Sequence, residues 1–225
     1  MILFTGGDGV LNLQKSGNTL KSNGNFLIRV RLDFVAAGYN VAAVDTPSDQ
    51  PSLRFFRTSP GHAIDIKGVA NYLRGLSQGP LWLIGTSCGT VSAASVAARL
   101  APGGPDGIVL TSTITTGQCL GATSVYSTNL NSIRVPVLIV SHTADLCPVS
   151  PMSGSQVLAE RMKATTDARF LSFSGGNKPE SGPCEPFSPH GYFGIESQVT
   201  TAIIAWMEAH PARPSSATGG AAAGR

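Results

Sequence analysis

The chain has 225 residues, of which 42% are hydrophobic and 13% are charged, and its formal net charge is +3. These values are typical of one folded domain and exclude an intrinsically disordered protein. The charge is too small and too scattered for nucleic-acid binding, and no apolar run is long enough to cross a membrane. We expect a folded domain over residues 1–210 and a disordered tail over 211–225, which is rich in Pro, Ser, Gly and Ala.

Short apolar runs alternate with amphipathic segments along the chain. The predicted strands are Ile2–Thr5, Val41–Val44, Leu81–Ile84, Gly107–Leu110, Val135–Val140 and Arg169–Phe173. The predicted helices are Phe26–Ala37, Ala63–Leu76, Val91–Leu100, Gly154–Ala164 and Ser197–Ala209. This alternation predicts an α/β fold, with a mostly parallel sheet of about six strands and helices on both faces.

Two connections bear on access to a site. Residues 111–134 are too few for a large helical lid, so we expect an open active site, with the loop Leu11–Asn25 on its rim. The first strand already has the composition of an interior strand, so the sheet is expected to end in an exposed edge, which is a route to self-association. Met1–Phe4 lacks the basic start of a signal peptide.

The strongest functional signal is Gly85-Thr86-Ser87-Cys88-Gly89, a Gly-x-Ser-x-Gly pattern between a predicted strand and a predicted helix. This context is typical of a nucleophile elbow, a tight turn that exposes its serine at the end of the strand. Ser87 is therefore the predicted nucleophile, and the backbone N–H of Cys88 is a predicted oxyanion-hole donor. The alternative is an ordinary strand–helix turn whose serine caps the helix.

The acid and the base of a triad follow in the chain. Asp145 comes just after the strand Val135–Val140, and His190 lies in a Pro/Gly-rich loop after the last strand. His190 would act as general base and then as general acid, and Asp145 would orient its ring. The alternatives are a loop-capping role for Asp145 and a hydrogen-bonded structural role for His190. His142 competes as the base, but it precedes Asp145 and so breaks the order serine, acid, histidine.

Three stretches carry a resemblance to a known family: Leu3–Gly9, the elbow, and Gly182-Pro183-Cys184-Glu185 leading into His190–Gly194. The chain resembles small bacterial hydrolases of the α/β-hydrolase superfamily that carry an export signal. The resemblance implies the fold and the triad, and it favours a periplasmic or secreted protein. It also implies a second oxyanion donor at Gly7, with Asp8 as the next choice. The alternative is that these glycines only form a turn.

The four cysteines are Cys88, Cys119, Cys147 and Cys184, which allow three complete pairings and form no Cys-x-x-Cys zinc pattern. A Cys147–Cys184 disulfide would tie the loop of the acid to the loop of the base, provided that the compartment is oxidising. Buried free thiols are the alternative. Cys88 is expected to be such a thiol.

Together these features predict a serine hydrolase that cleaves small-molecule carboxylic esters through an acyl-enzyme. No metal and no cofactor is expected, and neither nucleic acid nor a membrane is an expected partner. An amidase or peptidase and an acyltransferase need the same triad and remain alternatives. A non-catalytic binding domain that kept the fold is a further alternative.

Overall fold

A computed structural model describes residues 1–14, 16, 21–119 and 122–211. Six parallel strands form the main sheet, in the order β2-β1-β3-β4-β7-β8. They are β1 (Ile2–Phe4), β2 (Ala42–Ala43), β3 (Trp82–Thr86), β4 (Gly107–Thr111), β7 (Val137–His142) and β8 (Ala168–Phe173). The predicted fold class is thereby confirmed. The predicted tail over 211–225 lies outside the described residues except for Pro211.

The central strands are apolar because both faces of the sheet are covered. Every residue of β3, β4 and β7 is buried. Alternate side chains point to opposite faces, so Leu83 and Ile84 enter two different hydrophobic cores. This arrangement explains why the strands read as continuous apolar runs in the sequence and not as alternating ones.

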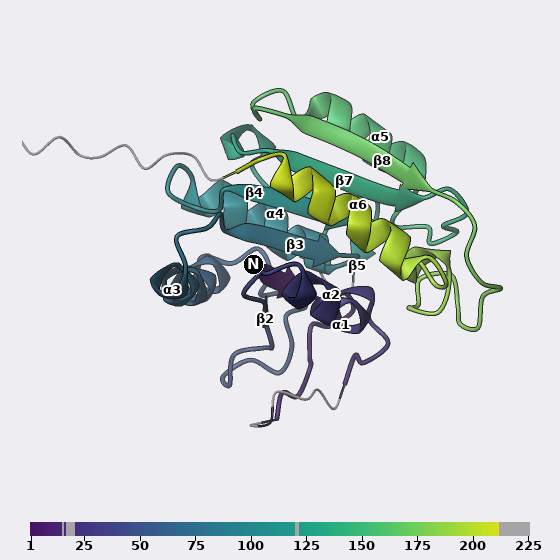
Figure 1. Cartoon of the computed structure of the whole chain (residues 1–225), viewed down its shortest axis with the longest axis horizontal. Coiled ribbons are helices and arrows are strands. Elements are labelled where there is room, and N and C mark those ends of the chain that lie inside the picture. The colour runs from purple at the N-terminus through teal and green to yellow at the C-terminus, as the bar shows by residue number, and fades with distance from the viewer. Residues whose placement is uncertain (15, 17–20, 120–121, 212–225) are drawn as a thin grey trace, which may run out of the picture.

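Helices form a layer on each face of the sheet (Figure 1). One core contains side chains of α3 (Pro60–Leu76), α4 (Gly89–Leu100) and α5 (Met152–Arg161). The other core contains side chains of α1 (Phe26–Arg29), α2 (Arg31–Ala36) and α6 (Glu196–Glu208). In Figure 1 the yellow helix α6 crosses in front of the sheet. Trp206 of α6 packs edge-on against Trp82 of β3, with ring centroids 5.4 Å apart.

The observed helices begin or end at somewhat different residues from the predicted ones, and two of these differences have a clear structural reason. The predicted helix Phe26–Ala37 is divided at Val30, whose φ of −95° and ψ of 4° are not helical. Val30 is buried in the same core as Phe34, so tertiary packing outweighs the local helical pattern there. The helix predicted to begin at Ala63 begins at Pro60, because the Ser59 side chain accepts a hydrogen bond from the His62 N–H, and proline suits the first turn.

The connection over residues 111–134 contains no α-helix in its described part. It holds an antiparallel pair, β5 (Gln118–Cys119) and β6 (Ala122–Thr123), and two single 3₁₀ turns, η1 (Val125–Ser127) and η2 (Leu130–Ser132). The absence of a large lid matches the prediction for this part. No helix among the described residues has the length and apolar character that a bilayer crossing needs.

Candidate active site

Ser87 occupies a strained turn directly after β3. Its φ is +52°, a left-handed value that non-glycine residues rarely adopt. The turn is closely packed: a side chain at Gly85 would collide with the Gly89 carbonyl, and one at Gly89 would collide with the Phe4 carbonyl. The helix α4 starts at Gly89 without a side-chain cap, so the geometry is that of a nucleophile elbow and not of a serine N-cap.

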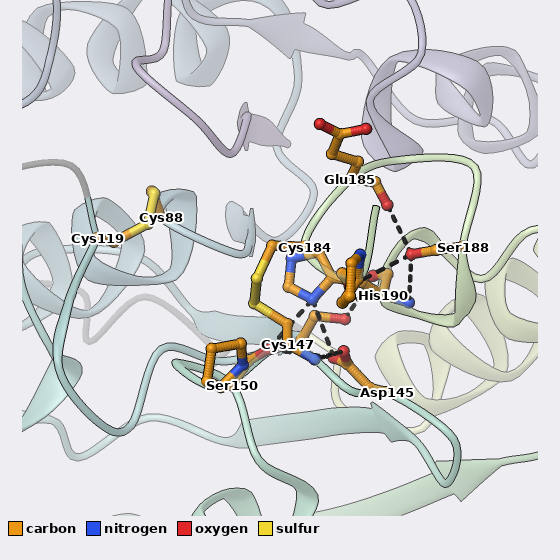
Figure 2. Close-up of a disulfide and its surroundings, with 12 residues drawn as sticks. Cys88, Cys119, Asp145, Cys147, Ser150, Cys184, Glu185, Ser188 and His190 are labelled. Carbon is orange, nitrogen blue, oxygen red and sulfur yellow. Dashed lines mark hydrogen bonds and ion pairs between the residues drawn. A yellow bond between two sulfur atoms is a disulfide. The ribbon is translucent and has the colours of Figure 1, made fainter. Parts of the chain in front are cut away.

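Asp145 and His190 are brought together at the C-terminal end of β7 (Figure 2). The His190 Nδ1 atom lies 2.9 Å from the Asp145 Oδ2 atom, and both side chains are buried. The second oxygen, Asp145 Oδ1, accepts a hydrogen bond from the Cys147 N–H at 2.9 Å. Asp145 therefore caps its own loop and orients the histidine, so the two roles considered for it are compatible.

The carboxylate determines the tautomer of the imidazole. Because an ionised carboxylate only accepts hydrogen bonds, the His190 Nδ1 atom carries the proton, which leaves a lone pair on Nε2. The Nε2 atom is buried and has no hydrogen-bond partner among the described residues. The structure thus unites the predicted acid and base, but it shows no hydrogen bond between Ser87 and the ring.

A cavity of about 270 Å³ lies beside these groups. Its wall includes His190, Thr86 and Gly6. Ser87 adjoins this wall, because a Cβ atom built on Gly6 would lie only 2.9 Å from the Ser87 Cβ atom. Ser22, Gly24 and Asn25 also line the cavity, so the described part of the loop Leu11–Asn25 forms part of the rim, as predicted. Residues 15 and 17–20 of that loop lie outside the description.

Buried hydroxyl groups hold the acid and the base from several sides. The Ser150 Oγ atom donates to Asp145 Oδ2 at 3.1 Å and also lies 3.1 Å from His190 Nδ1. Ser112 Oγ donates to the His190 carbonyl at 2.7 Å. Tyr192 donates to the Val140 carbonyl at 2.9 Å, and burial raises the pKa of its phenol, so the donor stays protonated. This network fixes the ring against the end of the sheet.

A disulfide joins Cys147 to Cys184, the pair expected from the sequence, with Cα atoms 4.6 Å apart. It links the loop of Asp145 to the loop that leads into His190 (Figure 2). The exposed chain between β8 and His190 is also closed by two backbone hydrogen bonds, from Asn177 N–H to the Phe193 carbonyl and from Glu180 N–H to the Phe187 carbonyl. The loop of the base is therefore anchored at several points.

The prediction that Cys88 is a free buried thiol is wrong. Cys88 forms a disulfide with Cys119, and their Cα atoms are 5.6 Å apart. The path of the connection over residues 111–134 brings Cys119 in β5 against the start of α4. The sequence gives no indication of that path. Cys88 is nevertheless buried directly after the elbow serine, at the position predicted to supply a backbone donor.

The glycine loop after β1 lies next to the elbow. Gly7 has a φ of +61° and, with Gly6, lines the cavity. Arg57 is fully buried beneath the loop and donates to the Thr5 and Gly7 carbonyls, each at 3.1 Å, and to Ser92 Oγ at 2.9 Å. Burial lowers the pKa of Arg57 to about 10, so the side chain remains charged at neutral pH. The loop is thereby connected to α4, the helix that follows Ser87.

The other histidines have structural surroundings. His142 accepts from the Ala144 N–H at Nδ1, and its Nε2 lies 3.0 Å from the Gly175 carbonyl, so both ring nitrogens are used. His62 is buried against the rings of Phe4 and Phe56, and burial, with a contribution from the charge of Arg57, lowers its pKa to about 4. His210 lies at the end of α6 and contacts the Asp167 carboxylate.

Sequence reasoning missed two side chains that support the site, Ser150 and Arg57. Ser150 follows Asp145 by five residues, a separation with no diagnostic value by itself. Arg57 lies in a polar stretch that reads as a surface loop.

No cluster of three His, Cys, Asp or Glu side chains suited to a metal ion occurs within the described ranges.

The sheet order, the elbow after β3 and the Asp–His pair at the strand ends together define the α/β-hydrolase fold. The chain is similar to solved structures of that fold. An alpha-beta serine hydrolase homologue from Coxiella burnetii has a TM-score of 0.60 and 16% identity, over 92% of this chain and 83% of that one. An esterase from Exiguobacterium antarcticum has a TM-score of 0.59 and 14% sequence identity, over 92% of this chain and 91% of that one. A monoacylglycerol lipase from Paleococcus ferrophilus has a TM-score of 0.55 and 17% sequence identity, over 93% of this chain and 94% of that one.

No model of a protein family and no curated protein sequence matches this chain. At identities of 14–17%, the structural likeness establishes the fold and leaves the reaction to be argued from the site.

Proposed function

We propose that the protein is a serine hydrolase that cleaves small carboxylic esters through an acyl-enzyme intermediate. The observation that carries this proposal is the His190 imidazole, held by Asp145 at Nδ1 and left with a lone pair on Nε2, in the wall of the cavity that the elbow serine adjoins. A neutral base in this tautomer is what a serine hydroxyl needs to become a nucleophile.

In the proposed mechanism, Ser87 attacks the ester carbonyl while His190 Nε2 accepts the serine proton. The imidazolium that forms is stabilised by the Asp145 carboxylate. His190 then protonates the departing alcohol, and a water molecule, deprotonated by the same nitrogen, hydrolyses the acyl-enzyme. The hydrogen bond between Ser87 and His190 forms when substrate binds, since catalytic contacts are often long in free enzymes.

The negative charge of the tetrahedral intermediate requires preorganised donors. We assign the backbone N–H of Cys88 and that of Gly7 to this role, with Asp8 as the next choice for the second donor. Gly7 supports this assignment because it lines the cavity and its carbonyl is held by Arg57, which limits movement of the peptide. The catalytic residues of the proposal are thus Ser87, Asp145 and His190.

Three further observations support a hydrolase of small esters outside the cytosol. The similar structures include proteins described as an esterase and a lipase, which suits ester cleavage more than amide cleavage. The cavity of about 270 Å³ would hold a short acyl chain. Two disulfides favour an oxidising compartment, in agreement with the periplasmic or secreted location that the sequence resemblance implies.

The test is the intact mass of the protein after incubation with a fluorophosphonate, together with turnover of p-nitrophenyl acetate. The wild type should gain one adduct and hydrolyse the ester, and Ser87→Ala should do neither. An adduct of equal yield in Ser87→Ala would overturn the assignment of the nucleophile. A folded wild type with no adduct and no turnover would instead favour a non-catalytic binding domain.

A further inference from the structure

The side chain of Asn25 has an orientation that its position in the fold dictates. Asn25 is the N-cap of α1, and its Oδ1 atom accepts a hydrogen bond from the Leu27 N–H at 3.1 Å. A carboxamide carries its acceptor and its donor on opposite branches of one plane, so the cap turns the Nδ2 amide group away from the helix. The positions of oxygen and nitrogen therefore follow from the cap itself.

The amide group is turned toward the elbow. A Cβ atom built on Gly6 would lie 3.5 Å from Asn25 Nδ2 and 2.9 Å from the Ser87 Cβ atom. Asn25 Nδ2 and Ser87 thus flank the same small space above the Cα atom of Gly6. The same cavity is lined by Asn25, Gly6, Gly7 and His190. A carbonyl bound for attack by Ser87 would have to enter the cavity that Asn25 lines.

We infer that the Asn25 side-chain amide donates a hydrogen bond to the acyl oxygen of the substrate, as a third oxyanion donor beside the backbone groups of Cys88 and Gly7. This inference rests on the proposed function, because it concerns the same acyl transfer. The amide suits the role chemically: it is a donor without charge or titration, and the cap holds it in place before substrate arrives. Close approach also explains the glycine at position 6, where any side chain would fill the space between donor and nucleophile.

Asn25 has a second role as a cap, and two substitutions separate the roles. Asn25→Ser keeps an N-cap acceptor and removes the amide donor, whereas Asn25→Ala removes both. The expected result for Asn25→Ser is a fall in kcat on the order of 10²-fold for p-nitrophenyl acetate, with KM and the unfolding midpoint close to wild type. Asn25→Ala should show the same fall in kcat and, in addition, a lower unfolding midpoint.

Inhibition by phenylboronic acid provides a readout that a purely structural role would not move. The boronate forms a tetrahedral adduct on the serine, with an oxygen in the position of the oxyanion. Its inhibition constant should rise in Asn25→Ser by a factor similar to the fall in kcat. Asn131→Ser, an exposed asparagine of η2 that does not line the cavity, is the matched control and should behave as wild type.

The outcomes separate this inference from the proposed function. If wild type shows turnover that Ser87→Ala lacks, and Asn25→Ser keeps both kcat and phenylboronic acid affinity within twofold, the donor role is overturned while the hydrolase stands. If Asn25→Ser loses activity only in proportion to a loss of folded protein, Asn25 is a cap and the donor role is again overturned. If wild type has no Ser87-dependent turnover, the proposed function fails and the donor role fails with it.

Discussion

The two sides of the proposed active site are held in different ways. On the base side, the loops of Asp145 and His190 are joined by the Cys147–Cys184 disulfide and by a network of hydroxyl groups. On the oxyanion side, Cys88 is tied to Cys119 by a disulfide, whereas the loop at Gly6–Asp8 contains no cysteine and is braced by one buried cation, Arg57. His190 lies at the end of a long, exposed connection after β8, whereas the loop at Gly6–Asp8 directly follows β1. A longer connection loses more conformational entropy when it is fixed, and a covalent link reduces that loss.

Asp145→Asn tests the base side and should have the largest effect. An amide can donate to Nδ1, which favours the tautomer whose Nε2 carries the proton and cannot accept one from Ser87. We expect kcat to fall about 10⁴-fold in p-nitrophenyl acetate assays. Ser150→Ala is the comparison, because it removes one neutral hydrogen bond to Asp145, and it should lower kcat by about tenfold or less. Equal losses in the two variants would contradict the assignment of Asp145.

Arg57→Met tests the oxyanion side. Methionine fills much of the same volume but leaves the Thr5 and Gly7 carbonyls without their donor, so the loop loses its brace. We expect kcat to fall on the order of 10²-fold with little change in KM, because misplacement of about 1 Å has that cost. Steady-state rates should be measured on protein shown to be folded by near-ultraviolet circular dichroism. Full activity in folded Arg57→Met would mean that the loop needs no brace.

Cys147→Ala/Cys184→Ala asks how much of the base side depends on the covalent link. The bond closes a loop with a sequence separation of 37 residues, and its removal should lower the free energy of unfolding by about 2–4 kcal/mol. Urea unfolding curves of the double variant and wild type measure this change. At temperatures where the variant is folded, the hydroxyl network should keep kcat within about tenfold of wild type. An unchanged unfolding free energy would show that the link does not constrain the chain.

The oxyanion side should also be sensitive to acid through His62, which packs against Phe4 and Phe56 and feels the charge of Arg57. The pKa of His62 is lowered from 6.5 to about 4, so between these values the unfolded chain binds a proton that the folded chain does not. Stability is therefore complete above pH 6.5 and falls as the pH falls toward 4. The loss between pH 7 and pH 5 should be about 2 kcal/mol.

The control for this pH dependence is His62→Leu. Its urea unfolding free energy should lack that part of the change between pH 7 and pH 5. The same slope in wild type and His62→Leu would assign the acid sensitivity to other groups.

The fold and the elbow were predictable because both depend on patterns of residues that are close together in the sequence. Apolar runs that alternate with amphipathic helices indicate a parallel sheet, and the glycines around Ser87 reflect contacts within one turn. Asp145 and His190 were predictable as candidate residues because each follows a predicted strand. Their hydrogen bond could be seen only in the structure.

The residues that support the site could not be predicted in this way, because their roles depend on which distant segments of the chain lie together in the fold. Arg57 is a charged residue whose burial only the fold reveals, and Asn25 lies far from Ser87 along the chain. The wrong expectation for Cys88 has the same origin, since its partner Cys119 comes from a connection without a clear periodic pattern. Val30 likewise ends a helix for reasons of packing in the core.

The excursion between β8 and His190 has a consequence for protein engineering. Its exposed tip at Lys178-Pro179 is separated from the His190 ring by the Asn177–Phe193 and Glu180–Phe187 backbone hydrogen bonds and by the disulfide of Cys184. Insertions at such a tip add little loop-closure entropy, because that cost grows only with the logarithm of length. The tip is therefore a suitable graft point for peptide segments, such as a surface-binding tag, that leave the positions of Asp145 and His190 unchanged.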